Sequence, residues 1–170
     1  MGGLYSLVNQ GGGPLSEKAV HDLVWWKLRL TLSQPRSFSL MPISQDPLII
    51  YTDAEGSGGM GAVLVSSTPA WLAGHVDKSL RPLLHHRKTH IFVYEALAAF
   101  LSAVIFNLAG QRVLFFVGNT SALGALRKGS SSSWDVQCVV DLFWDLAASR
   151  HMEIFFRYVP SKLPQGAKLQ

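Results

Sequence analysis

Hydrophobic and polar positions recur with two different spacings along the chain, and the change between them predicts the order of helices and strands. Short apolar runs rich in β-branched and aromatic residues predict five strands, at about residues 48–53, 61–66, 70–76, 111–117 and 152–159. Apolar positions three or four residues apart predict helices, at about residues 14–30, from 89 onward, through 123–127 and over 134–148. Asn119 with Thr120 predicts the cap of the third of these helices. After the first helix, the order is three strands, a helix, a strand, two helices and a strand. We expect an α/β domain whose first three strands form an antiparallel meander.

The first strand delivers an acidic residue at its end. The stretch PLIIYTDAEGSGGMGAVLV contains the apolar run Leu48 to Tyr51, then Asp53, a glycine-rich turn and a second apolar run. Such a continuous apolar run suggests a strand covered on both faces. Asp53 would then emerge at the rim of a central sheet, where a rigid scaffold holds a charged group in place. This placement suits a metal ligand.

A second acidic residue lies on the helix that begins near Thr89. Glu95, Ala98, Ala99 and Ser102 share one helical face. Small residues on that face allow the helix to lie close to a sheet, and the acid is carried inward with them. A buried acid requires a partner or a metal ion, so Glu95 is either a metal ligand or half of a salt bridge with a nearby cation.

The segment from Asp77 to His90 is the densest positive region of the sequence. Its basic side chains are Lys78, Arg81, His85, His86, Arg87, Lys88 and His90. The segment is either a solvated loop or a phosphate-contacting loop beside the site. A zinc site from His86 and His90 would lack an evident third ligand.

Composition narrows the class of protein. The chain has 170 residues, of which 48% are hydrophobic and 15% charged, which indicates one packed domain and excludes wholesale disorder. A net charge of +4 is compatible with an anionic partner. The single cysteine, Cys138, excludes an internal disulfide and a cysteine zinc cage, and its apolar neighbours predict a buried thiol.

Two observations bear on membranes and secretion. The run Ile91 to Ala109 is long enough to be considered a membrane span, but Glu95, Ser102 and Asn107 lie inside it, which favours a buried helix. The N-terminal residues show no charged start followed by an apolar run. We therefore expect an intracellular protein without a membrane partner.

Four motifs in this order resemble the ribonuclease H domain of retrotransposon reverse transcriptases. They are TDAEGSGGMGAVLV with Asp53, YEALAA with Glu95, VLFFVGNTSALGALRKGSS after the fourth strand, and the closing FFRYVPSK. The resemblance covers about residues 47–163. It implies a ribonuclease H-like fold, with a five-stranded mixed sheet flanked by helices, and hydrolysis of the RNA strand of an RNA/DNA hybrid.

The resemblance also implies roles for individual residues. Asp53 and Glu95 would be catalytic and would hold two magnesium or manganese ions, which activate water and stabilise the leaving oxygen. The substrate-binding positions would be His85, His86, Arg87, Lys88, Asn119, Arg127 and Lys128.

The sequence departs from this family at two places. The third acid belongs directly after the fourth strand, where this chain has Gly118 followed by Asn119, and the fourth belongs beyond Pro160, where SKLPQGAKLQ contains no acid. Glycine offers no ligand, and an amide oxygen is a weak substitute for a carboxylate. Two hypotheses follow: an impaired nuclease, or an inactive domain of the same fold that binds nucleic acid or packs against a polymerase.

The resemblance extends to domain organisation. The helix containing Trp25 and Trp26 is similar to the tether that joins a reverse transcriptase domain to this domain. We expect residues 1–13 to form a flexible lead-in, 14–46 a tether helix and linker, 47–163 the ribonuclease H-like domain and 164–170 a tail. The expected partners are an RNA/DNA hybrid and an upstream reverse transcriptase domain.

Overall fold

The computed structural model describes residues 14–32 and 46–160. The predicted lead-in, most of the predicted linker and the predicted tail lie outside the described residues. The chain divides into two compact units, Met1–Ser44 and Gln45–Gln170. The first unit contains one described helix, α2 (Glu17–Leu32), which confirms the helix predicted there. The negative charge of Glu17 in its first turn stabilises the helix, because it lies near the positive end of the helix dipole.

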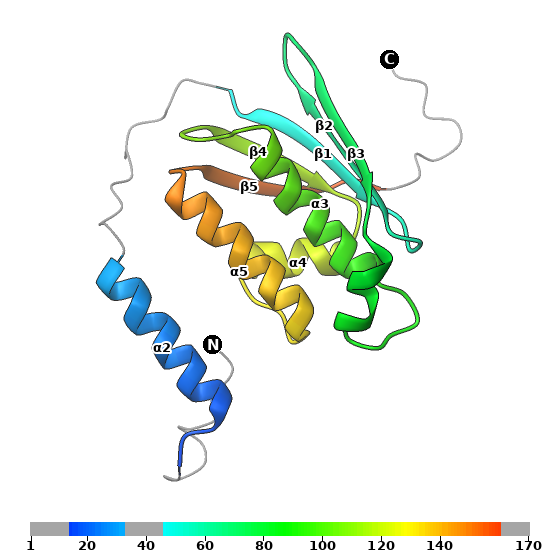
Figure 1. Cartoon of the computed structure of the whole chain (residues 1–170). Coiled ribbons are helices and arrows are strands. Elements are labelled where there is room, and N and C mark those ends of the chain that lie inside the picture. Colours follow the sequence, from blue (N-terminus) through cyan, green and yellow to red (C-terminus); the bar gives the residue numbers. More distant parts are fainter. Residues whose placement is uncertain (1–13, 33–45, 161–170) are drawn as a thin grey trace. The chain divides into compact units, whose positions relative to one another are not determined.

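The second unit is built on a five-stranded mixed sheet (Figure 1). Its strands are β1 (Leu48–Ala54), β2 (Gly59–Val65), β3 (Ala70–His75), β4 (Arg112–Val117) and β5 (Glu153–Tyr158). Their order is β3-β2-β1-β4-β5. The pairs β1/β2 and β2/β3 are antiparallel, and the pairs β1/β4 and β4/β5 are parallel. Both the predicted meander and the predicted mixed sheet are confirmed.

Three helices and one short 3₁₀ helix connect the strands. They are η1 (Lys78–Leu83), α3 (Ile91–Ile105), α4 (Thr120–Lys128) and α5 (Trp134–Ser149). In Figure 1, α3, α4 and α5 lie on the same face of the sheet. The element order agrees with the one predicted, except that η1 was not predicted within the basic segment. Within the described part of the chain, no helix is both long and apolar enough to cross a membrane.

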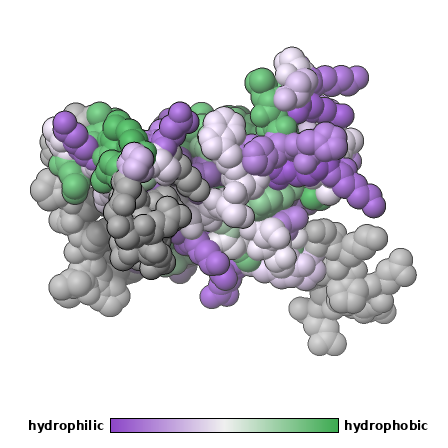
Figure 2. Space-filling view, turned by 90° about the horizontal axis from the view of Figure 1, so that it is seen from below, coloured by the Kyte–Doolittle hydropathy of each residue, from purple (hydrophilic) through white to green (hydrophobic). Residues whose placement is uncertain are grey.

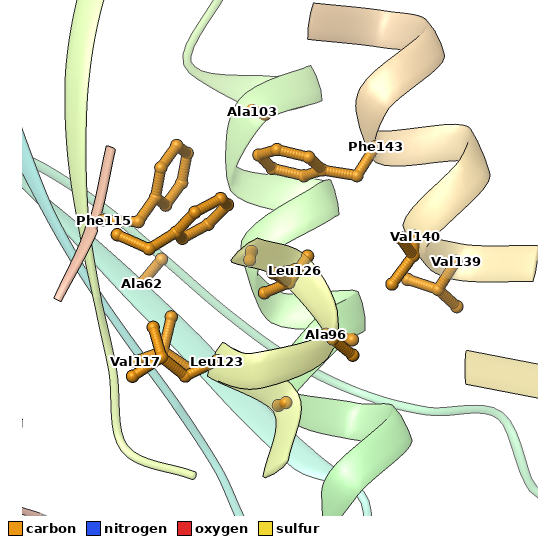
Figure 3. Packing of buried hydrophobic residues seen from close by; sticks show 14 of the residues in the cluster. Ala62, Ala96, Ala103, Phe115, Val117, Leu123, Leu126, Val139, Val140 and Phe143 are labelled. Atoms are coloured by element: carbon orange, nitrogen blue, oxygen red, sulfur yellow. The ribbon is translucent and has the colours of Figure 1, made fainter. Parts of the chain in front are cut away.

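The core lies between the sheet and these helices. Figure 3 shows Phe115 of β4, Leu126 of α4 and Phe143 of α5 converging on it. The rings of Phe115 and Phe143 meet edge to face, with their centroids 5.6 Å apart. Full burial of such a side chain contributes about 1.5–3 kcal/mol, so this layer fixes the helices on the sheet.

The prediction that β1 is covered on both faces is wrong. Ile50, Thr52 and Ala54 are buried under the helices, whereas Tyr51 is 41% exposed and Asp53 is also exposed. Side chains alternate between the two faces of a strand, so a continuous apolar run on β1 supplies both a buried and an open face. Between residues 46 and 160, no helix covers the open face.

Candidate active site

Asp53 and Glu95 reach the same place from two elements. Asp53 is the second-last residue of β1, and Glu95 lies in the second turn of α3, which packs against β1. Glu95 is only 1% exposed, and Ala98, Ala99 and Ser102 on its face are fully buried. The small residues therefore bring the helix close to the sheet and carry the acid inward, as the sequence predicted.

The surroundings of Glu95 oppose its ionisation. Burial, and next the negative charge of Asp53, raise the pKa of Glu95 from 4.5 to about 7, although the main-chain amides of Ala54 and Gly118 act in the opposite direction. Within the described part of the chain, its Oε2 atom is buried without a hydrogen-bond partner. Among the described residues no cation forms an ion pair with Glu95.

Gly118 occupies the position from which a third acid would reach the site. Thr52 of β1 pairs with Val117 of β4 in parallel register, so Gly118 directly follows the strand end beside Asp53. Its amide interacts with the Glu95 carboxylate. Gly118 does not have a positive φ, so its backbone conformation is open to residues with side chains.

The two carboxylates meet the needs of one divalent cation but not of two. Magnesium is held in proteins by one or two carboxylates, with water and substrate phosphate completing the shell. Asp53 and Glu95 fit one such ion, and the unpartnered Glu95 oxygen provides a vacant donor. No group of three or more acidic, histidine or cysteine side chains suited to a metal occurs in the described ranges. These residues therefore do not fit a pair of ions.

A groove of about 540 Å³ opens beside Asp53 on the open face of the sheet. Its lining includes Gly118 on one side and Trp71 on the other, with Val159 and Pro160 at the end of β5. This volume is in the range of ligand sites. The exposed carboxylate of Asp53 therefore adjoins a mostly apolar depression.

The predicted basic segment combines η1 with the loop that follows it. In the view of Figure 2, hydrophilic residues gather toward the right, where Figure 1 has η1 and this loop. His85, His86 and Lys88 are exposed. They are available for contact with an anion, and their predicted role in substrate binding remains a prediction.

Arg87 has a partner within the domain. Its guanidinium Nη2 lies 2.6 Å from Asp135 Oδ1, and the Asp135 side chain is only 2% exposed. Burial alone would raise the pKa of Asp135, but hydrogen bonds from Ser133, Arg87 and the amides of His85 and Val136 hold it below its usual value. The pair fastens the loop to the start of α5, so any phosphate contact by Arg87 competes with this role. The sequence analysis did not predict this pair, whose two residues lie 48 positions apart in the chain.

The other predicted binding residues lie on α4 or at its start. The Asn119 side chain accepts hydrogen bonds from the amides of Ser121 and Ala122, which confirms the predicted helix cap. Arg127 donates to the carbonyl oxygen of Phe156 at the outer strand of the sheet. Lys128 is exposed in the last turn of α4. Asn119 adjoins the site through Gly118, whereas Arg127 lines a different groove.

The sheet order, the helices and the placement of two carboxylates define the class of the domain. The fold is ribonuclease H-like, as predicted. The first acid comes from the central strand and the second from the helix that follows the meander.

Solved structures share this fold at low sequence identity. LC11-RNase H1, isolated from compost by a metagenomic approach, is 16% identical, with a TM-score of 0.52 over 69% of this chain and 86% of that one. The N-terminal RNase H domain of a Mycobacterium tuberculosis protein, solved as a fusion with maltose-binding protein, is 17% identical, with a TM-score of 0.50 over 68% of this chain and 88% of that one. No protein-family model and no curated protein matches the sequence.

Proposed function

We propose that this domain binds RNA/DNA hybrids and hydrolyses their RNA strand at a strongly reduced rate. The observation that carries the proposal is the buried Glu95 carboxylate, which has an unpartnered oxygen and lies beside a second carboxylate. An uncompensated pair of acids is costly in a folded protein, and a bound divalent cation removes that cost. The motif resemblance supports an origin in a retroelement polyprotein with an upstream reverse transcriptase domain.

Each group has a separate part in the proposed reaction. Asp53 and Glu95 would hold magnesium, which lowers the pKa of bound water and stabilises charge on the leaving oxygen. The exposed side chains of His85, His86 and Lys88 would hold the sugar-phosphate backbone without reading its bases. Asn119 would position the substrate's sugar-phosphate backbone beside Gly118.

Gly118 supports the reduced rate. A third carboxylate would add a metal ligand and negative charge where magnesium would be held, and glycine contributes neither. Loss of one group that stabilises a transition state commonly costs about 10²–10³ in rate.

The second hypothesis is an inactive domain that only binds nucleic acid or packs against a polymerase. The lack of a three-ligand cluster in residues 14–32 and 46–160 favours it. The nuclease and the nucleic-acid-binding domain both predict hybrid binding, and they differ in whether any RNA is cut.

A magnesium titration of hybrid cleavage separates the two hypotheses. The wild-type chain, Asp53→Asn and Gly118→Asp are compared with a labelled RNA strand in the hybrid. We expect weak magnesium-dependent cleavage that Asp53→Asn abolishes and Gly118→Asp raises about a hundredfold. Cleavage that is absent from the wild type and unchanged in Gly118→Asp would contradict a damaged nuclease and leave the binding domain.

A further inference from the structure

The open face of the sheet carries a continuous row of large side chains. Successive pairings place Trp71, Val63, Tyr51, Phe116 and Arg157 side by side across all five strands. Trp71 is 75% exposed, and the rings of Tyr51 and Phe116 stack with their centroids 4.7 Å apart. The row therefore presents aromatic surface to solvent.

A second row lies beside the first. Val65, Ile49, Leu114 and Phe155 are neighbours by the same pairings, and Val65 and Phe155 are exposed. Contiguous apolar surface of this kind marks an interaction site on a folded protein.

The end of this face at β5 is positively charged. Arg112, Arg127 and Arg157 line a groove of about 510 Å³ together with Trp144 and Phe155, and no carboxylate is among its lining residues. Arg112 pairs with Glu153 and lies over the Phe155 ring, 5.7 Å from its centroid. The Arg157 side chain forms no ion pair or hydrogen bond with any described residue. The groove thus combines arginine with aromatic rings.

These charges decide which partner the face suits. An apolar protein surface docked here would bury the Arg157 guanidinium without a counter-ion, which is costly. An unpaired nucleic-acid strand offers phosphates to the guanidinium and a flat base to each aromatic ring, the combination by which single strands are held. We propose that the open face binds an unpaired nucleic-acid strand, with bases on Trp71 and Phe155 and phosphate on Arg157.

The geometry connects this face to the candidate active site. Four strand spacings separate β3 from β5, about 19 Å, which is a path for a few nucleotides. Trp71 lines the same groove as Asp53 and Gly118, so a strand crossing the face passes the Asp53 carboxylate. The inference rests on the proposed function only in that both ligands are nucleic acids.

The test measures the affinity of the full chain for a fluorescent oligothymidylate and for an RNA/DNA hybrid by anisotropy. We expect Trp71→Ala and Phe155→Ala each to weaken oligothymidylate binding about tenfold, since one stacked base is lost. Trp134→Ala is the matched control, because Trp134 is 65% exposed but lies at the start of α5, on the helix-covered side. This control should bind within about twofold of the wild type.

A second pair of variants keeps the two proposals separate. Arg157→Gln should weaken the oligothymidylate more than the hybrid, and Lys88→Gln should weaken the hybrid more than the oligothymidylate. If the wild-type chain binds oligothymidylate in a Trp71-dependent way but does not bind the hybrid, the proposed function alone is overturned. Oligothymidylate affinity that Trp71→Ala and Phe155→Ala leave unchanged would overturn this inference. Sedimentation showing a dimer that Trp71→Ala converts to a monomer would also overturn it and assign the face to a second copy.

Discussion

Replacing Glu95 by glutamine should remove a pH-dependent loss of stability. The folded domain holds the Glu95 proton up to about pH 7, whereas the unfolded chain releases it near 4.5. Between these values the folded state binds more protons, so the free energy of unfolding falls as pH rises. The loss is complete above the folded pKa.

The magnitude follows from the pKa difference. One pKa unit corresponds to about 1.4 kcal/mol, so the rise from 4.5 to about 7 costs about 3 kcal/mol at alkaline pH. Glu95 is almost fully buried, so solvent screening reduces this figure little. With a urea dependence of about 1–3 kcal/mol per molar, the unfolding midpoint should fall by about 1–3 M across the range.

The assay is urea unfolding followed by circular dichroism at intervals between about pH 4 and 8. Histidines titrate in the same window, so the quantity of interest is the difference between wild type and Glu95→Gln at each pH. The free energy of unfolding of the variant should rise relative to that of the wild type as pH rises. Asp53→Asn should remove only part of the slope, because burial is the larger cause and remains. A difference that stays constant with pH would refute the raised pKa of the buried Glu95, and a slope unchanged by Asp53→Asn would refute its placement against Asp53.

Three further predictions test the neighbouring interactions. Magnesium should raise the melting temperature of the wild type at about pH 8 and leave that of Glu95→Gln nearly unchanged, as calorimetry can show. Arg87→Met should lower the free energy of unfolding by about 3 kcal/mol, because it leaves the buried Asp135 unpaired, and urea unfolding measures this. Asn119→Ala should cost about 1 kcal/mol in the same assay through loss of the α4 cap, whereas Asn119→Asp should restore it.

Local patterns predicted most of the fold. The order of helices and strands along the chain followed from the alternation of apolar runs with helical spacing, and Glu95 was placed inward from its position among Ala98, Ala99 and Ser102 alone. These signals lie within single elements, where the period of the chain determines which side faces the core. The cap at Asn119 belongs to the same kind of signal.

Interactions between distant segments could not be predicted in this way. The apolar run of β1 is compatible with helices on one face of the sheet or on both. The exposure of Tyr51 therefore could not be predicted from the sequence and is evident only from the packing of the sheet. The sequence predicted Arg87 as a substrate-binding residue, and only the packing of α5 brings Asp135 into contact with it. Similarly, the row from Trp71 to Arg157 exists only through the pairing of all five strands.

The carboxylates at the rim illustrate how one missing residue changes the energetics of a site. A third acid at position 118 would add negative charge beside Asp53 and Glu95, so the metal-free domain would be less stable and Glu95 would bind its proton more tightly. Gly118 instead presents its amide to the Glu95 carboxylate, which favours the ionised form. The domain therefore tolerates two acids without a cation more readily than it would tolerate three. In the proposed nuclease the same feature would weaken magnesium binding, so relief of repulsion and loss of catalytic power would arise from a single position.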